Sequence, residues 1–594
     1  MKSPFVLSPL NYSCVELTPS HFSKQYQDAL EYILAIPNDD MLVGFRRRAG
    51  LPHPGNELGG WYSNDGSFDI YTWEEIANAF PQWISFLARS YRITGDERAR
   101  IKAVEMLDEW AKTVEPDGYC FYSRALLVQY SFDKHVQSLL DAREFLGWEP
   151  AFKYLDMIVG WGEKNLCRSR IPASPLHLNF TGGDPAIGIM DNEWYTLSES
   201  LYRAYEMTGE ERYKDFAAVW HYDHYWDGLR RRDPESMTGL HGYSHVNTLG
   251  SAALAYRVTG EEKYKETLIA AYDMFQNYQL LANGGYALAE HMGDPRGSNY
   301  YTIEYEAKSF EVCCGSWAVF KTVRHLLSLT GEARYGQWAE AVLYNAIGSA
   351  LPFKDDCQRR GKTFYYSDLR LGGGKKLYFE HSYPCCSGTY PQAVAEYTNI
   401  IYYTGENGLY ISQYIPSMID ARIGENRIKV EIAGNYPCEE TIRLKIHSSG
   451  NYAIHLRVPA WVKRGSAAIT LNGAAMNVAA DPNEWAVLSY AWKEGDVVEI
   501  TFPMYLHLFP IHTYYPWRTA LMYGPWMLCA EGKVPRLKGS YLDADTVAKR
   551  ADGLRFLAET PEGREVIFRP YMEFGEKEWG TVYFDLDKTT NPVY

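Results

Sequence analysis

The stretch "YRVTGEEKYKET" (256–267) occurs in four versions along this sequence of 594 residues. The others are "YRITGDERAR" (91–100), "YEMTGEERYKDFA" (205–217) and "LSLTGEARYGQWAE" (327–340). Each version follows an amphipathic run and precedes another run with the same helical spacing. Threonine and glycine followed by acidic residues are typical of a helix end, a tight turn and a new helix start. Each version therefore predicts the turn of a helical hairpin.

The spacing of these turns predicts how many hairpins the chain holds. Thr208 and Thr259 occupy the same position in two neighbouring copies and lie 51 residues apart. About 400 residues would then hold roughly six hairpins, of which the missing copies have degenerate sequences. We expect a closed α/α barrel rather than an open solenoid, because no capping repeats are evident.

The pattern changes after "NIIYYTGENGLYISQYIPS" (399–417). Segments such as "RIKVEIAG" (427–434) and "TIRLKIHS" (441–448) alternate apolar and polar residues between turn residues. This alternation is typical of antiparallel strands and favours a β-sandwich. The expected fold class is α+β multidomain, with an (α/α)6 barrel followed by one or more C-terminal β-sandwich domains.

These patterns predict four parts. Residues 1–18 form a strand segment that joins the later β domains, and residues 19–405 form the barrel. Residues 406–510 form a β-sandwich domain, and residues 511–594 form a further β-rich domain.

Composition and charge narrow the class of partner. Aromatic residues make up 15% of the chain, which suits stacking on sugars as well as ordinary core packing. The net charge of −15 disfavours nucleic acid and anionic membranes, because neither attracts an acidic surface. The N-terminus lacks the apolar core of a signal peptide, and we find no apolar run long enough to span a bilayer. We expect a cytoplasmic protein that takes an oligosaccharide or glycoside substrate, with room for a homodimer.

Four of the ten cysteines form two pairs of neighbouring residues. Cys313 and Cys314 open an amphipathic run, whereas Cys385 and Cys386 lie in a segment rich in turn residues. In a helix, Glu311 and Cys314 would share one face. Three thiolates and a carboxylate form a donor set suited to tetrahedral zinc. The residues alone leave two other interpretations open, namely buried inert thiols and a purely structural zinc site.

The order and spacing of several segments resemble glycoside hydrolase family 127, the β-L-arabinofuranosidase type. The segments are "SPLNYSCVEL" (8–17), "FRRRAGLP" (45–52), "HVNT" (245–248), "FEVCCGSWA" (310–318), "FYYSDL" (364–369), "CCSGTYPQ" (385–392) and "LRVPAWV" (456–462). The resemblance implies an (α/α)6 barrel followed by β-sandwich domains, in agreement with the pattern above.

The resemblance also implies a metal centre and a nucleophile. Zinc would be held by Glu311, Cys314, Cys385 and Cys386, and Cys385 would attack the sugar in a retaining mechanism. The interval between Glu311 and Cys314 is one residue longer than the Glu-x-Cys element of the family, which makes Cys313 an alternative ligand.

A carboxylic acid must protonate the leaving oxygen and later activate water. The family carries this glutamate in a Gly-Gly-rich segment upstream of the helical ligands. Here that segment is "NGGYALAEHMGDP" (283–295), in which we expect Glu290 to be the acid/base and keep Asp294 as the alternative.

Four residues are expected to bind substrate. His245, Asn247 and Tyr366 match family positions near the sugar. Asp133 stands where many relatives have histidine, which points to altered recognition of a hydroxyl group. Without the resemblance, His245 would be assigned to the core and Tyr366 to packing.

We therefore expect a zinc-dependent retaining exo-glycosidase with a cysteine nucleophile. It would release a terminal β-L-arabinofuranose or a related L-sugar, with a uronic or branched sugar as further options. One alternative is a polysaccharide lyase or sugar epimerase on a similar toroid, with tyrosine and histidine pairs as the reacting groups. Another is a non-catalytic carbohydrate-binding protein with a structural zinc.

Overall fold

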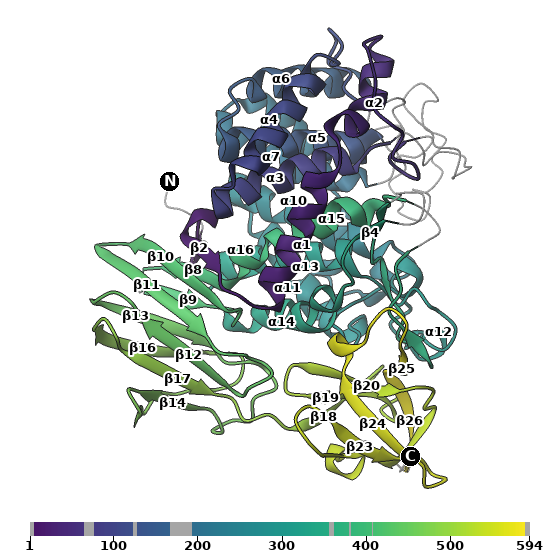
Figure 1. Ribbon diagram of the computed structural model, residues 1–594, viewed down its shortest axis with the longest axis vertical. Helices are drawn as coiled ribbons and strands as arrows, with labels where there is room; N and C mark the ends of the chain where they lie inside the picture. The colour runs from purple at the N-terminus through teal and green to yellow at the C-terminus, as the bar shows by residue number, and fades with distance from the viewer. Residues whose placement is uncertain are drawn as a thin grey trace.

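A helical body and two β-rich parts make up the molecule (Figure 1). The computed structural model describes residues 5–63, 76–122, 128–166, 193–355, 361–378, 382–406 and 408–588. The helices of the body are α1 (His21–Ala35), α2 (Asn38–Arg48), α3 (Ala79–Thr94), α4 (Glu97–Ala111), α5 (Val128–Asp141), α6 (Ala151–Asn165), α7 (Leu197–Thr208), α8 (Glu211–Val219), α9 (Asp223–Arg230), α10 (Gly242–Thr259), α11 (Glu262–Tyr278), α12 (Asn299–Thr302), α13 (Val312–Thr330), α14 (Gly336–Asn345), α15 (Cys385–Ala395) and α16 (Tyr397–Ile401).

Within the described residues, six of these helices close a ring. In order around the ring they are α3, α5, α7, α10, α13 and α15, and α15 packs against α3 again. A second helix packs on each of them from outside, namely α4, α6, α8, α11, α14 and, for α15, the N-terminal α1. The predicted fold class, a helical α/α barrel followed by β domains, is confirmed.

The repeated turns end the inner helices as the sequence predicts. α3, α7, α10 and α13 each end at the threonine of the repeat, and the following glycine takes a left-handed conformation. In the turn after α10, the Thr259 hydroxyl donates to the carbonyl of Ala255 and accepts from the amide of Glu261. Gly260 has φ 74°, which an L side chain rarely adopts. One threonine thus adds a second hydrogen bond to a helix carbonyl and satisfies a free amide just past the helix end.

Close approach of α15 to α3 fixes one side of the ring. A Cβ atom at Gly388 would lie 2.0 Å from Oε1 of Gln82, so any larger residue at this position on α15 would displace the Gln82 amide. The indole N–H of Trp83 on α3 also donates to the carbonyl of Ser387. These contacts lie within the first turn of α15, where the second cysteine pair begins.

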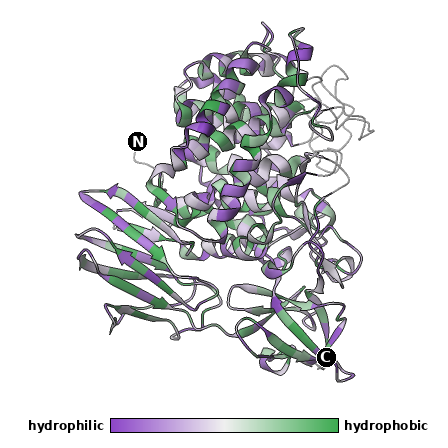
Figure 2. Ribbon diagram, viewed as in Figure 1, coloured by the Kyte–Doolittle hydropathy of each residue, from purple (hydrophilic) through white to green (hydrophobic). Residues whose placement is uncertain are grey.

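Two sheets below the barrel form a sandwich. The described strands of the first sheet are β1 (Ser8–Pro9), β8 (Tyr402–Gly405), β9 (Gly408–Ile411), β13 (Gly450–Arg457) and β16 (Trp485–Trp492). Those of the second are β15 (Ala474–Ala475), β14 (Ala468–Leu471), β17 (Val497–Thr501), β12 (Thr441–Ile446), β11 (Asn426–Ala433), β10 (Ser417–Ile423) and β2 (Val15–Leu17). β11 packs against β13, buried residues alternate with partly exposed ones along β11, and the strands of the sandwich carry both hydrophobic and hydrophilic residues (Figure 2). This is the burial pattern of a two-layer sandwich.

The start of the chain belongs to both sheets of this sandwich. β1 pairs antiparallel with β8, and β2 pairs antiparallel with β10. The chain therefore passes from the sandwich into α1 before the ring begins, and α1 completes the outer layer beside α15.

A third sheet lies beside the barrel. Its described strands are β21 (Arg536–Ser540), β26 (Tyr583–Lys588), β19 (Arg518–Tyr523), β20 (Trp526–Glu531), β24 (Glu565–Pro570), β23 (Phe556–Glu559), β22 (Ala548–Arg550), β18 (Leu506–Pro510), β25 (Trp579–Thr581) and β7 (Gly373–Gly374). Two small ladders join β3 (Phe310–Glu311) to β6 (Tyr366–Ser367) and β4 (Lys354–Asp355) to β5 (Gly361–Lys362). Among the described residues, no helix is both long and apolar enough to cross a membrane.

The hairpin connections set the direction of the inner helices. Because an outer helix returns the chain after each inner one, all inner helices run the same way, and their N-terminal ends meet at one end of the ring. We call this the N-terminal end of the ring. Residues in the first turns of α5, α10, α13 and α15 therefore converge there.

Candidate active site and metal centre

Three thiols and one carboxyl group lie together at the N-terminal end of the ring. One donor atom from each of Glu311, Cys314, Cys385 and Cys386 lies within 4.8 Å of the others. The Cys314 sulfur is 3.5 Å from each of the other two sulfurs, and the Cys385 sulfur is 3.2 Å from Oε1 of Glu311. The structure thus brings together the four residues expected to bind zinc. The eight cysteines of the described residues form no disulfide.

Two neighbouring inner helices deliver these side chains. α13 begins directly after Glu311 and carries Cys314 in its first turn, and α15 begins with Cys385 and Cys386. Backbone amides at a helix start carry partial positive charge, so both helix ends favour the thiolate and carboxylate forms.

Burial opposes ionisation of the same groups. It raises the pKa of Cys386 to about 12 and the pKa values of the Cys314 and Cys385 thiols well above the ordinary thiol value. The pKa of Glu311 is raised first by burial and then by the neighbouring Cys385. At neutral pH these groups are therefore protonated unless a cation stabilises the charged forms.

The donor set fits zinc. Three sulfurs and one carboxylate oxygen suit its tetrahedral coordination, and the ion offsets the cost of ionising buried ligands. Oε2 of Glu311 is buried without a hydrogen-bond partner, so this carboxylate keeps an oxygen available. Cys313 does not join the donors, because its thiol donates to the carbonyl of Phe364 at 3.0 Å.

Cys385 differs from the other two thiols in exposure. Cys314 and Cys386 are buried, whereas Cys385 is partly exposed. The hydroxyl of Tyr365 lies 3.1 Å from the Cys385 sulfur. Of the three cysteines, Cys385 is thus the one that is not fully buried.

Glu290 lies on a strained segment beside this cluster. Ala287, Ala289 and Glu290 all have positive φ, which costs conformational energy for residues other than glycine. The hydroxyl of Tyr366 donates to Oε1 of Glu290. Tyr366 is also the cross-strand partner of Glu311 in the ladder of β3 and β6, which places both side chains on one face.

Asp294 lies in a different environment. Its carboxylate pairs with the guanidinium of Arg296, and this contact lowers the pKa of Asp294 to about 2. A carboxyl group that is ionised throughout the neutral range is a poor proton donor. Of the two acid/base candidates, Glu290 therefore has the better surroundings.

Three site residues escaped the sequence analysis, namely Glu193, His241 and Tyr365. The His241 imidazole lies between carboxylates, with Nε2 3.6 Å from Glu311 and 4.0 Å from Glu290, and Nδ1 4.0 Å from Glu193. Tyr365 contacts the Cys385 sulfur, as described above. Only their surroundings in the fold identify them, although His241 and Tyr365 each lie close in sequence to a residue that was selected.

His245 lies one helical turn after His241. Its ring packs against Tyr195, Tyr222 and Tyr225, and its Nδ1 lies 2.7 Å from the carbonyl of His241. Burial lowers the pKa of His245 to about 3. The structure thus gives His245 the surroundings of a neutral core histidine.

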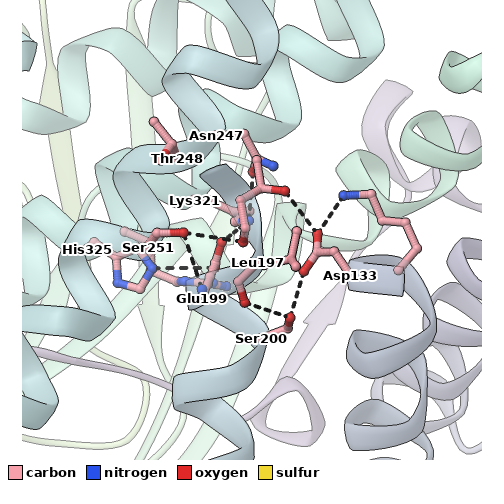
Figure 3. Close-up of polar contacts among 12 residues, drawn as sticks. Asp133, Leu197, Glu199, Ser200, Asn247, Thr248, Ser251, Lys321 and His325 are labelled. Atoms are coloured by element: carbon pink, nitrogen blue, oxygen red, sulfur yellow. Dashed lines mark hydrogen bonds and ion pairs between the residues drawn. The ribbon is translucent and has the colours of Figure 1, made fainter. Parts of the chain in front are cut away.

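Asn247 and Asp133 lie deeper in the ring, in a buried polar network (Figure 3). The ammonium of Lys321 donates to Oδ1 of Asn247 and pairs with Glu199. Asp133 accepts from Ser200 at 2.6 Å and pairs with Lys134 at 2.9 Å. Within the described residues, neither side chain forms a hydrogen bond or an ion pair with the thiol cluster.

A cavity of about 570 Å³ lies at the opposite end of the ring. Asp133, Glu199 and Lys321 line it, together with residues near the C-terminal ends of the inner helices. Its charged lining is already paired, as in the contacts of Arg89 and Arg324 with Glu396. This cavity contains none of the four candidate zinc ligands.

Comparison with known families matches most of the chain. Residues 14–131 and 182–399 match the catalytic domain of GH127 β-L-arabinofuranosidases, and residues 408–504 match the middle domain of the same family. No curated protein matches the sequence.

Solved structures share the fold along nearly the whole chain. A GH127 β-arabinofuranosidase is 16% identical, with a TM-score of 0.71 and 99% of each chain covered. A protein described as a glycoside hydrolase is 17% identical, with a TM-score of 0.71 and 98% of each chain covered. A GH127 β-L-arabinofuranosidase from Geobacillus stearothermophilus T6 is 17% identical, with a TM-score of 0.69; the match covers 96% of this chain and 100% of that one.

Proposed function

The chain belongs to GH127, the family of β-L-arabinofuranosidases, and is a glycoside hydrolase; from this premise we propose a zinc-dependent retaining exo-glycosidase with Cys385 as nucleophile. The proposed product is a terminal β-L-arabinofuranose or a related L-sugar. The observation that carries the proposal is the partly exposed Cys385 thiol within a cluster of otherwise buried donors.

The proposed reaction has two displacement steps. In the first, the Cys385 thiolate attacks the anomeric carbon, the bond to the leaving oxygen breaks, and Glu290 gives that oxygen a proton. In the second, Glu290 takes a proton from water, the water oxygen attacks the anomeric carbon, and the carbon–sulfur bond breaks to return the thiolate. Two inversions give net retention.

The neighbouring tyrosines Tyr365 and Tyr366 would hold the two reacting groups. Tyr365 contacts the Cys385 sulfur and Tyr366 donates to Glu290, while the two rings lie 4.1 Å apart. One rigid dipeptide can therefore fix the nucleophile and the acid/base relative to each other.

Glu311, Cys314, Cys385 and Cys386 would hold the zinc ion. When bound, zinc would keep the sulfurs deprotonated at neutral pH, at some cost in the nucleophilicity of Cys385. We also place the protein in the cytoplasm, because a reducing compartment keeps sulfurs that lie 3.5 Å apart from forming a disulfide.

The test combines metal analysis with hydrolysis. Zinc content and release of reducing sugar from L-arabinofuranosides and rhamnosides would be measured for the wild type and for Cys385→Ala. The expected result is about one zinc per wild-type chain and loss of turnover in a variant that keeps its circular dichroism spectrum. A metal-free active wild type, or full turnover by Cys385→Ala, would rule out the proposal.

A further inference from the structure

Two buried phenols at the N-terminal end of the ring lack hydrogen-bond partners. Tyr130 lies in the first turn of α5 and Tyr243 in the first turn of α10, and they are 4% and 2% exposed. Neither hydroxyl has a hydrogen-bond partner among the residues that the structure describes. Buried hydroxyls are nearly always hydrogen-bonded, so these two hydroxyls are available to bond a ligand.

A carboxyl oxygen that also lacks a hydrogen-bond partner among the described residues lies nearby. Oε2 of Glu193, just before the short helix η5 (Trp194–Thr196), is buried and has no hydrogen-bond partner within the described part of the chain. Its other oxygen is 4.0 Å from His241, whose opposite nitrogen is 3.6 Å from the proposed zinc ligand Glu311. The Tyr243 ring lies 6.2 Å from the His241 ring, which connects the phenol to the same site.

Electrostatics agree with this placement. After burial, the charges that raise the pKa of the Tyr130 phenol include those of Glu193 and Cys385, and those that raise the pKa of Tyr243 include Glu193 and Glu311. Burial also raises the pKa of Glu193 to about 8; Lys134 opposes this shift, while Asp133 and Glu290 add to it. Glu193 therefore carries a proton at neutral pH and can donate it in a hydrogen bond.

We propose that Tyr130, Tyr243 and Glu193 form a pocket that binds the hydroxyl groups of a neutral glycone and rejects a uronic acid. This inference rests on the proposed function and narrows its substrate class. Sugar hydroxyls both donate and accept, and so satisfy two phenols and a carboxyl group at once.

Rejection of a uronate follows from the charge of the site. The described groups around the pocket include the carboxyl groups of Glu290 and Glu311 besides that of Glu193. The nearby ammonium of Lys134 is already paired with Asp133 at 2.9 Å, and that of Lys308 lies over the Tyr366 ring at 5.3 Å. A sugar carboxylate would be buried beside these acidic groups, and the ammonium that acts on Glu193, that of Lys134, is already paired with Asp133, so burial of the added charge is costly.

The test measures binding without turnover. In a Cys385→Ala background, calorimetry at pH 7 would follow L-arabinose, L-rhamnose and L-fucose as neutral probes, and D-galacturonate and D-glucuronate as acidic ones. We expect at least one neutral sugar to bind and the uronates to bind at least tenfold more weakly. Tyr130→Phe and Tyr243→Phe should each weaken binding of the neutral sugar by about tenfold, because each variant loses one buried hydrogen bond.

Two further variants separate a binding role from a structural one. Glu193→Gln keeps a donor and an acceptor and should retain affinity within about threefold, whereas Glu193→Ala should lose it. Tyr344→Phe removes an equally buried, unpartnered phenol from the outer helix α14 and should change nothing.

Three results would overturn the pocket: no neutral sugar binds, a uronate binds as well as the best neutral sugar, or all variants bind like the parent. Because the background lacks the proposed nucleophile, these results are independent of the hydrolysis test. An inactive wild type that still binds a neutral sugar through these residues would overturn the proposed function and leave the pocket intact.

Discussion

At the scale of single residues, Tyr365 and Tyr366 connect the two groups that the reaction needs. Tyr365 contacts the Cys385 sulfur at 3.1 Å, and Tyr366 donates to Glu290. Tyr366 lies on β6 and Tyr365 lies just before that strand, so strand alternation does not force the two side chains apart, and their ring centroids are 4.1 Å apart. The dipeptide therefore acts as a spacer between nucleophile and acid/base.

Replacing Tyr365 by phenylalanine tests this role. The variant loses one hydrogen bond to a sulfur that reacts as a thiolate, which is worth roughly 1.5 kcal/mol, or about tenfold in rate. We expect kcat to fall by about that factor on an aryl L-arabinofuranoside, with KM and zinc content nearly unchanged. A wild-type kcat, or loss of the metal, would show that Tyr365 does not position the nucleophile.

Some site residues are predictable from sequence and others are not. Cys314, Cys385 and Cys386 belong to two Cys-Cys pairs, and Glu311 lies three residues before Cys314, so two short segments suffice to select them. Glu193 and His241 reach the site through the closure of the ring, which brings α10 and the turn before α7 together. His245 and Asn247 were selected by a motif, but they lie on turns of α10 that point deeper into the ring.

At the scale of helices, the repeated turn shows how a short sequence phrase produces a hairpin. Local chemistry determines the turn, because threonine, glycine and acidic residues within a span of five supply hydrogen bonds and a left-handed backbone where one helix ends and the next begins. The hairpins and the barrel were therefore predictable. The closing contact of α1 with α15 was not, because no local pattern links residues so far apart in sequence.

The threonine of this turn offers a stability test. Thr259→Val removes the bond to the carbonyl of Ala255 and the bond from the amide of Glu261. We expect a loss of about 1 kcal/mol in the free energy of unfolding, measured by urea titration. Thr267→Val, on the middle of α11, removes only a bond to the carbonyl of Lys263 and should cost less. Equal losses would contradict the capping role.

The buried network in Figure 3 holds inner helices together through charge. Lys321 on α13 pairs with Glu199 on α7 and donates to Asn247 on α10. Burial alone would raise the pKa of Glu199, but Lys321 and then His325 hold it well below its usual value. A depressed carboxyl pKa stabilises the fold above the unfolded pKa and loses that contribution as the pH falls.

Lys321→Met should therefore be strongly destabilising. It leaves the Glu199 carboxylate buried without its main partner, and we expect a loss of about 3 kcal/mol at pH 8. The loss should shrink at pH 5, because the carboxyl group then takes up a proton. The double variant Lys321→Met, Glu199→Leu should recover much of the stability. Unfolding at both pH values gives the answer, and a loss that does not depend on pH would contradict the ion-pair account.

At the scale of the whole molecule, the metal centre couples ligand protonation to the fold. Cys314 and Cys386 come from two inner helices, so one ion would tie α13 to α15. The strands of the sandwich and of the third sheet are predictable from the alternation of apolar and polar residues. The placement of these sheets beside the barrel depends on contacts between distant segments, which the alternation does not reveal. One example is the pairing of β7 with β25.

Zinc binding should release protons. Burial raises the pKa values of Glu311 and the three thiols, so the metal-free cluster is protonated at neutral pH. Calorimetric titration of zinc into the metal-free protein, in buffers of different ionisation enthalpy, should show more than one proton released per ion. The affinity should fall by about tenfold per pH unit for each proton released as the pH decreases. Binding without proton release would contradict the ligand set.

The most direct test of the central claim is the mass of the enzyme during turnover. Glu290→Gln slows the second step, and an aryl L-arabinofuranoside with a good leaving group still allows the first, so the glycosyl-enzyme should accumulate. Acid quenching followed by peptide mass spectrometry should find one glycosyl residue on the peptide that contains Cys385. An adduct on another residue, or turnover in the wild type with inversion of configuration at the anomeric carbon, would contradict the account.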